Sequence, residues 1–163
     1  MSVKLVGQDD ATALAGESAS IFILEKYTAV ASGNMTEYRV KSSASGHVKC
    51  AIYADSAGEP GALITAMNTG QAVAAGQWNT LTFTSTPITK GTVYWLAFNM
   101  DTLGAIGNLL TGADIGRFKS ATYSTFTFPN PAGSGFTNYA YGELIAGWGT
   151  PTAVGRSFGF LIG

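Results

Sequence analysis

The residues best suited to nucleophilic chemistry in this sequence are its one histidine, His47, and its one cysteine, Cys50. A Cys-His dyad needs the two side chains within hydrogen-bond reach of each other. Both residues fall in the alternating segment 47–54, where side chains three positions apart point to opposite faces of a strand. A local dyad is therefore excluded, and we predict that the chain is not an enzyme and has no catalytic residues.

Paired carboxylates are the other common catalytic device, because glycosidases need two of them across a cleft. The candidates are Asp9, Asp10, Asp55, Glu59, Asp101, Asp114 and Glu143. Most of them lie in predicted turns, where Asp side chains commonly accept backbone N–H bonds. We therefore expect turn roles for these carboxylates and keep hydrolysis only as a third hypothesis.

The same few histidine, cysteine and carboxylate residues limit which metals the chain could bind. Asp55 and Glu59, or Asp9 and Asp10, could supply charge to a structural calcium ion, although their spacing does not match an EF-hand loop. One histidine and one cysteine cannot complete a structural zinc site. We expect no cofactor other than a structural calcium ion, for which Asp55 and Glu59 are the main candidates and Asp9 and Asp10 the alternative.

The densest aromatic stretch spans residues 123–141, and Trp148 follows it. Rings beside Asn, Thr and Ser are suited to stacking on sugars or to anchoring a protein interface. The candidate ligand or interface residues are Phe136, Asn138, Tyr139, Tyr141 and Trp148. We expect the alternating part, 121–128, to be mainly core, together with Trp78 and Trp95, whose indole N–H groups should meet backbone acceptors.

Short segments of period-2 alternation, separated by Gly, Pro, Asn, Asp and Ser, position these residues. The predicted strands are 20–27, 36–41, 47–54, 63–73, 79–84, 92–99, 121–128, 139–148 and 156–162. Residues 93–98 are apolar on both faces, which predicts a central strand covered on both sides. Residues 9–17 and 103–116 are irregular and are predicted as loops.

This pattern predicts an all-β fold: an antiparallel, jelly-roll-like β-sandwich of eight or more strands. Residues 1–163 are expected to form one sandwich domain, with residues 1–18 as a candidate N-terminal arm. Hydrophobic residues make up 46% of the chain and charged residues 12%, which is far from the composition of a disordered protein.

The charge balance argues against two classes of partner. The formal net charge is -1 and no basic run is present, so neither nucleic acid nor a membrane surface is expected to bind. The apolar segment 21–24 is much shorter than the roughly 20 residues of a membrane helix. The first ten residues have no apolar core typical of a secretion signal.

Three motifs carry a resemblance to a known kind of module. They are IYADSAGEPGAL at residues 52–63, GQWNTL at 76–81 and GTVYWLAF at 91–98. In this order they resemble a jelly-roll-like β-sandwich module of phage structural and bacterial surface proteins, over roughly residues 35–100. The resemblance implies the fold and implies no catalytic residue.

The resemblance and the missing leader favour a virion structural protein, as a capsid decoration or a tail or fibre component. It would act by protein-protein assembly with other virion proteins and copies of itself, and its location would be the virion. The hydrophobic end, residues 158–163, would be an exposed edge unless it pairs with a neighbour. The alternative is a carbohydrate-binding module or adhesin domain that holds surface glycans on an aromatic loop platform, located outside the cell or at its surface.

Overall fold

The computed structural model describes residues 1–9, 19–102, 108–110, 116–139 and 141–153, and all regular structure within them is β-strand. In chain order the strands are β1 (Val3–Gly7), β2 (Ile21–Thr28), β3 (Gly33–Ser42), β4 (Gly46–Ser56), β5 (Glu59–Val73), β6 (Gln77–Ile88), β7 (Val93–Met100), β8 (Asn108–Leu110), β9 (Gly116–Ser120), β10 (Thr137–Tyr139), β11 (Tyr141–Glu143) and β12 (Ile145–Pro151). No helix capable of crossing a bilayer occurs in these described ranges.

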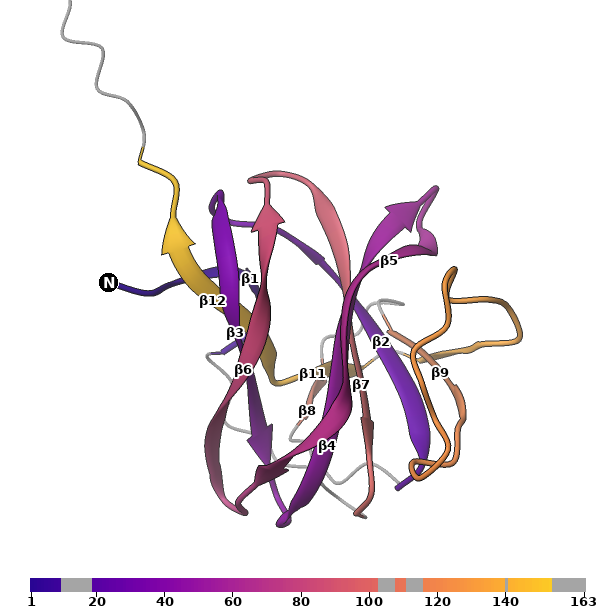
Figure 1. Ribbon diagram of the computed structural model, residues 1–163. Coiled ribbons are helices and arrows are strands. Elements are labelled where there is room, and N and C mark those ends of the chain that lie inside the picture. Colours follow the sequence, from indigo (N-terminus) through magenta and orange to yellow (C-terminus); the bar gives the residue numbers. More distant parts are fainter. Residues whose placement is uncertain (10–18, 103–107, 111–115, 140, 154–163) are drawn as a thin grey trace, which may run out of the picture.

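Two antiparallel sheets face each other (Figure 1). One has four strands in the order β1-β12-β3-β6, and the other has six in the order β10-β9-β2-β7-β4-β5. From β1 to β7 the chain changes sheet at every step except the β4–β5 hairpin, and β12 then returns between β1 and β3. This order is that of a jelly roll. The predicted all-β sandwich is confirmed.

The main core lies between the two sheets. On β4, Val48, Cys50 and Ile52 point into it, and Leu96 and Phe98 of β7 lie on the same side. These five side chains are almost fully buried, as the alternation along 47–54 and the apolar segment 93–98 predict. Cys50 is thus a core residue whose pKa is raised well above its ordinary value by burial.

A second core covers the outer face of the six-stranded sheet. Its buried members are Phe22, Leu24, Ala51, Tyr53, Trp95, Ala97, Phe128 and Ala132. The last two belong to residues 121–136, which we call the covering loop (orange in Figure 1). Since β7 lies inside this sheet with both faces buried, the prediction of a central, doubly covered strand is confirmed.

The prediction of a strand over 121–128 is wrong, because these residues form turns and irregular structure. The backbone of the covering loop is held by side chains of the sheet. The Lys49 ammonium donates to the carbonyls of Tyr123 (2.7 Å) and Phe126 (2.8 Å), and the Tyr53 hydroxyl donates to that of Pro129 (2.9 Å). Buried carbonyls need such partners, and here side chains replace a strand neighbour.

Other boundaries also differ from the prediction. Residues 3–7 of the candidate N-terminal arm pair with β12 as β1, so this part is a sheet strand. The strand predicted over 139–148 is instead three strands: the last residue of β10, the whole of β11 and the first part of β12. The loop predicted over 103–116 contains the short strand β8. The strand predicted over 156–162 lies outside the described residues, as do residues 10–17 of the predicted N-terminal loop.

Truncating the covering loop's buried anchor should destabilise the fold. Phe128 is 5% exposed and contacts the rings of Phe22 and Phe126. Phe128→Ala is expected to lower the free energy of unfolding by about 3 kcal/mol, through lost burial and the cavity left behind. Urea denaturation followed by fluorescence measures this, with Ile64→Ala as the control because Ile64 is 39% exposed. Equal losses in the two variants would contradict a second core.

Candidate functional site

The predicted interface residues do not form one surface. Phe136 and Asn138 lie beside β9 on the six-stranded sheet, whereas Trp148 lies on β12 in the four-stranded sheet. Tyr139 and Tyr141 pair through their backbones with Gly116 and Leu110, and their side chains lie outside the described part of the structure. Phe136 is half-buried and stacks edge-on against Phe22, with ring centroids 5.5 Å apart.

A cavity of about 340 Å³ lies beside Phe136. Its lining residues are Glu59, Pro60, Arg117, Gly133, Ser134, Gly135, Phe136 and Asn138. Glu59 and Pro60 begin β5, Arg117 comes from β9, and the others come from the covering loop and β10. The covering loop therefore does two things: it seals the second core and it forms one wall of this cavity.

Arg117 is the buried charge of the cavity, with 5% of its surface exposed. Its Nε and Nη2 donate to the two carboxylate oxygens of Glu59 at 3.0 and 2.8 Å, and its Nη1 donates to the Gly116 carbonyl at 2.9 Å. Its guanidinium carbon lies 5.4 Å from the centroid of a Trp95 ring. This fork-to-fork pairing is the geometry in which arginine recognises a carboxylate most strongly.

Glu59 lies near two cations, Arg117 and Lys26, and near one carboxylate, Asp55, which acts to raise its pKa. The hydrogen bonds from Arg117 are the main reason that the pKa of Glu59 lies below its ordinary value, and the charges of Arg117 and Lys26 add to the effect. Lys26 also lies above Trp95, with its ammonium 5.4 Å from the ring centroid. The carboxylate at this cavity is thus already balanced by cations of the chain itself.

The surroundings of Asp55 and Glu59 disfavour the calcium ion predicted there. Asp55 accepts the Trp95 indole N–H (2.9 Å) and the Gly58 backbone N–H (2.9 Å), so its oxygens serve the turn and the second core. The positive charges of Arg117 and Lys26 beside Glu59 would repel a calcium ion. Among the residues that the structure describes, no three His, Cys, Asp or Glu side chains gather as metal ligands.

Two predictions about the tryptophans are wrong: the acceptor expected for the Trp95 indole N–H and the core position expected for Trp78. Trp95 is fully buried as predicted, but its N–H meets the Asp55 carboxylate and not a backbone acceptor. Trp78, predicted as core, is only half-buried and lies on the outer face of the four-stranded sheet. Period-2 alternation places Trp78 on the opposite face from the core residue Leu81, since the two are three positions apart.

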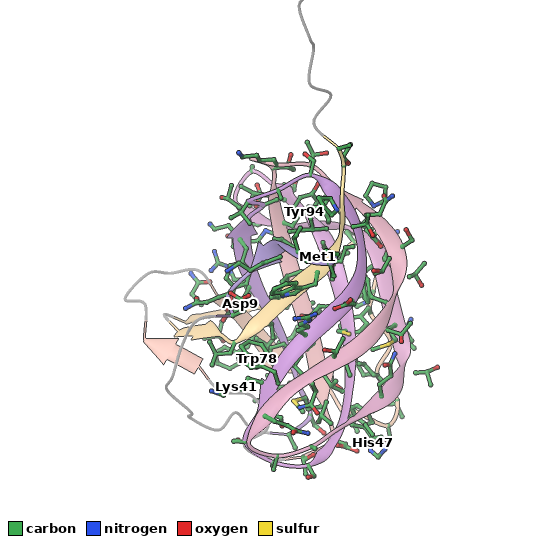
Figure 2. All side chains as sticks on the ribbon, turned by 90° about the vertical axis from the view of Figure 1, so that its left-hand side faces the viewer. Met1, Asp9, Lys41, His47, Trp78 and Tyr94 are labelled. Carbon is green, nitrogen blue, oxygen red and sulfur yellow. The ribbon has the colours of Figure 1, made fainter. Side chains whose placement is uncertain are left out.

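We call this outer face of the four-stranded sheet the open face, and Figure 2 looks onto it. Asp9, Arg39, Trp78 and Trp148 line a cleft of about 210 Å³ there. Its aromatic and Arg side chains are half-buried, whereas the corresponding residues on the other sheet are buried under the covering loop. The two sheets therefore differ in how much of their outer faces the described residues cover.

Arg39 organises the cleft of the open face. Its guanidinium carbon lies 3.9 Å from the centroid of a Trp148 ring, and its Nε and Nη2 donate to Glu37 Oε2 at 3.0 and 2.6 Å. Asp9 accepts a hydrogen bond from the Lys4 ammonium. The Trp148 indole nitrogen is buried and has no hydrogen-bond partner in the described part of the chain.

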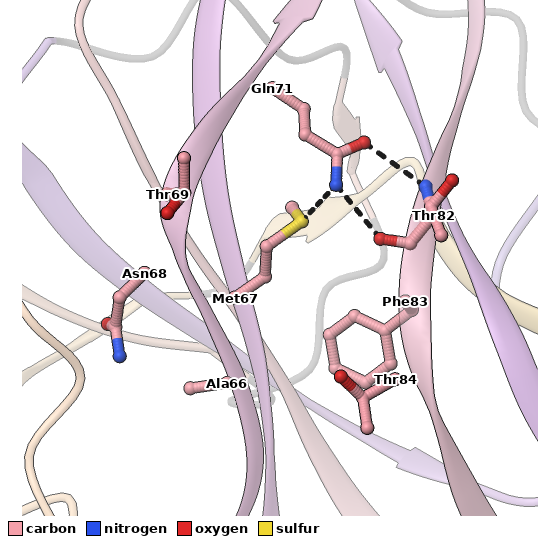
Figure 3. A pocket seen from close by; sticks show the side chains of 8 residues that line it. All are labelled: Ala66, Met67, Asn68, Thr69, Gln71, Thr82, Phe83 and Thr84. Atoms are coloured by element: carbon pink, nitrogen blue, oxygen red, sulfur yellow. Dashed lines mark hydrogen bonds between the residues drawn. The ribbon is translucent and has the colours of Figure 1, made fainter.

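A third hollow, of about 350 Å³, lies between the edge strands β5 and β6 (Figure 3). The Gln71 amide donates to the Thr82 carbonyl at 2.9 Å and accepts the Thr82 N–H at 3.1 Å, and it also contacts Met67. A side-chain amide thus takes the place of a strand partner on the β6 edge. None of the eight lining residues is charged, so the hollow offers little for binding chemistry beyond backbone pairing.

His47 and Cys50 are separated as predicted, because His47 is exposed and Cys50 lies in the core. No sequence pattern predicts the histidine's partner, Asp101, which lies 54 positions further along the chain. His47 Nδ1 lies 2.9 Å from Asp101 Oδ2, and Thr102 Oγ1 donates to Asp101 Oδ1 (2.9 Å). Within the described residues, the hydroxyl bonded to this pair thus points at the carboxylate and not at the imidazole, which is not the arrangement of a triad.

No protein-family model matches the chain, and no curated protein matches it either.

The His47–Asp101 pair predicts a pH dependence of stability. Partial burial acts to raise the pKa of Asp101, but hydrogen bonds from the His47 backbone, the His47 ring and Thr102 hold it below its ordinary value. Asp101 therefore stabilises the fold above the ordinary pKa of Asp, and this contribution is lost as the pH falls through the lowered value. Asp101→Asn should melt below the parent at pH 7, and the gap should narrow below about pH 4. A gap that is constant from pH 7 to pH 3 would contradict this.

Proposed function

We propose that this chain is a non-enzymatic structural domain of a virion, a capsid decoration protein or a tail or fibre component, that works by protein-protein assembly. The observation that carries the proposal is the open face, with Trp78, Trp148 and Arg39 around one cleft. Tryptophan and arginine are the residue types most enriched in the energetic centres of protein interfaces. The partners proposed are copies of this chain and neighbouring virion proteins.

The chemistry of the chain agrees with an assembly role. The one cysteine is buried in the core and the one histidine lies at the surface with Asp101, so neither is set up as a nucleophile or its base. A net charge of -1 leaves association to shape and to aromatic and hydrogen-bond contacts. Jelly-roll sandwiches supply a rigid face for such contacts, although the fold alone does not specify a function.

Removing the aromatic centre of the open face should weaken assembly. Trp78→Ala is expected to raise the dissociation constant between copies about 30-fold, since a central tryptophan contributes about 2 kcal/mol or more. Light scattering over a concentration series measures the solution mass. Val30→Ala is the matched control, because Val30 is an exposed apolar side chain outside the open face. A parent protein with the mass of one chain at every concentration would count against self-assembly.

A carbohydrate-binding module or adhesin domain is the second candidate, and the cavity beside Phe136 favours it. An aromatic ring next to Ser134, Asn138 and a buried arginine offers an apolar contact together with polar groups that could fix a ligand's orientation. Binding on a glycan array that decreases with Phe136→Ala but not with Trp78→Ala would support this candidate. Loss with Trp78→Ala alone would place the glycan on the open face instead.

A further inference from the structure

We propose that the cavity beside Phe136 binds a sugar residue that carries a carboxylate, such as a hexuronic acid, and that this carboxylate replaces Glu59 on Arg117. The inference rests on the second candidate function, the carbohydrate-binding module, and names its class of sugar. Three features of the cavity carry it: a fixed buried arginine, an exposed internal carboxylate, and a polar and aromatic wall of suitable size.

Arg117 is held in place independently of Glu59. Its Nη1 donates to the Gly116 carbonyl, and Trp95 lies beneath the guanidinium group. Rotation of Glu59 away from the cavity would therefore leave Nε and Nη2 directed at the same position. A planar pair of donors fixed in this way is preorganised for another carboxylate, so little ordering free energy is lost on binding.

Glu59 is suited to being displaced. Its side chain is 61% exposed although its partner, the Arg117 side chain, is only 7% exposed. The glutamate lies at the start of β5, directly after the turn that follows Asp55, so its side chain has solvent to move into. An exposed carboxylate on a buried arginine is an internal substitute that an external carboxylate can replace without leaving the arginine unpaired.

The remaining wall favours a sugar over a larger partner. The cavity of about 340 Å³ lies at the small end of the range of small-molecule sites, roughly 300–1,000 Å³, which suits one or two rings. Phe136 supplies an apolar ring, and Ser134 and Asn138 supply polar groups of the kind that pair with hydroxyls. Lys26 and Lys119 add positive charge near this end of the sheet, which favours an anionic sugar over a neutral one.

The test titrates the full chain with glucuronate, glucose and acetate, using calorimetry and thermal melting at pH 7. Glucuronate should bind and raise the melting temperature, whereas glucose should bind at least tenfold more weakly. In Glu59→Ala the internal competitor is gone, so glucuronate should bind about tenfold more tightly than to the parent, which corresponds to about 1.4 kcal/mol. The variant should melt below the parent without ligand, and glucuronate should recover most of the difference.

The matched control is Glu37→Ala, which removes the carboxylate partner of Arg39 on the opposite sheet. It should leave glucuronate affinity unchanged. Equal binding of glucose and glucuronate would overturn the carboxylate inference while leaving a carbohydrate-binding function intact. Acetate binding as tight as glucuronate would overturn the sugar assignment. Absence of glucuronate binding to both the parent and Glu59→Ala would overturn the inference as a whole.

Discussion

A strand that is apolar on both sides needs a covering layer on each side, and β7 imposes this requirement on the whole molecule. Leu96 and Phe98 point into the space between the sheets, while Trp95 and Ala97 point outward. The four-stranded sheet covers the first pair. The covering loop must cover the second, because exposed tryptophan and phenylalanine rings would otherwise form a large apolar patch.

Burying the covering loop requires polar side chains of the sheet beneath it. A loop packed on an apolar face has carbonyls that water cannot reach, and Lys49 and Tyr53 of β4 reach out of the sheet to pair with them. Lys49 is itself 8% exposed, so the loop and the lysine satisfy each other. Phe136, at the end of the covering loop, packs against Phe22 of the second core and lines the proposed ligand cavity together with Asn138 and Arg117, so sealing the second core also builds a wall of this cavity.

The two sheets consequently differ in their outer surfaces. The covering loop buries the second core of the six-stranded sheet and lines the cavity at Glu59 and Arg117, and the four-stranded sheet presents Arg39 and two tryptophans. Each arginine lies against an indole ring and pairs with a glutamate, but Arg117 is buried and Arg39 is half-buried. Burial makes Arg117 suited to a small anionic ligand, while the accessible Arg39 face is suited to a broader contact.

The alternation of side chains by itself determined the sandwich, most of its strands and the separation of His47 from Cys50, and the continuous apolar segment 93–98 determined which strand is central. Tertiary structure alone decided which outer face is covered and which distant residues meet. Residues 121–128 alternate like a strand yet form a loop. Alternation shows which side chains face an apolar surface, but it does not show whether a neighbouring strand pairs with the backbone. Trp78 and Trp95 are both predicted to be core residues, but only Trp95 lies under the covering loop. Glu59 and Arg117 are 58 positions apart, and only the packing of β9 against the start of β5 brings their charges together.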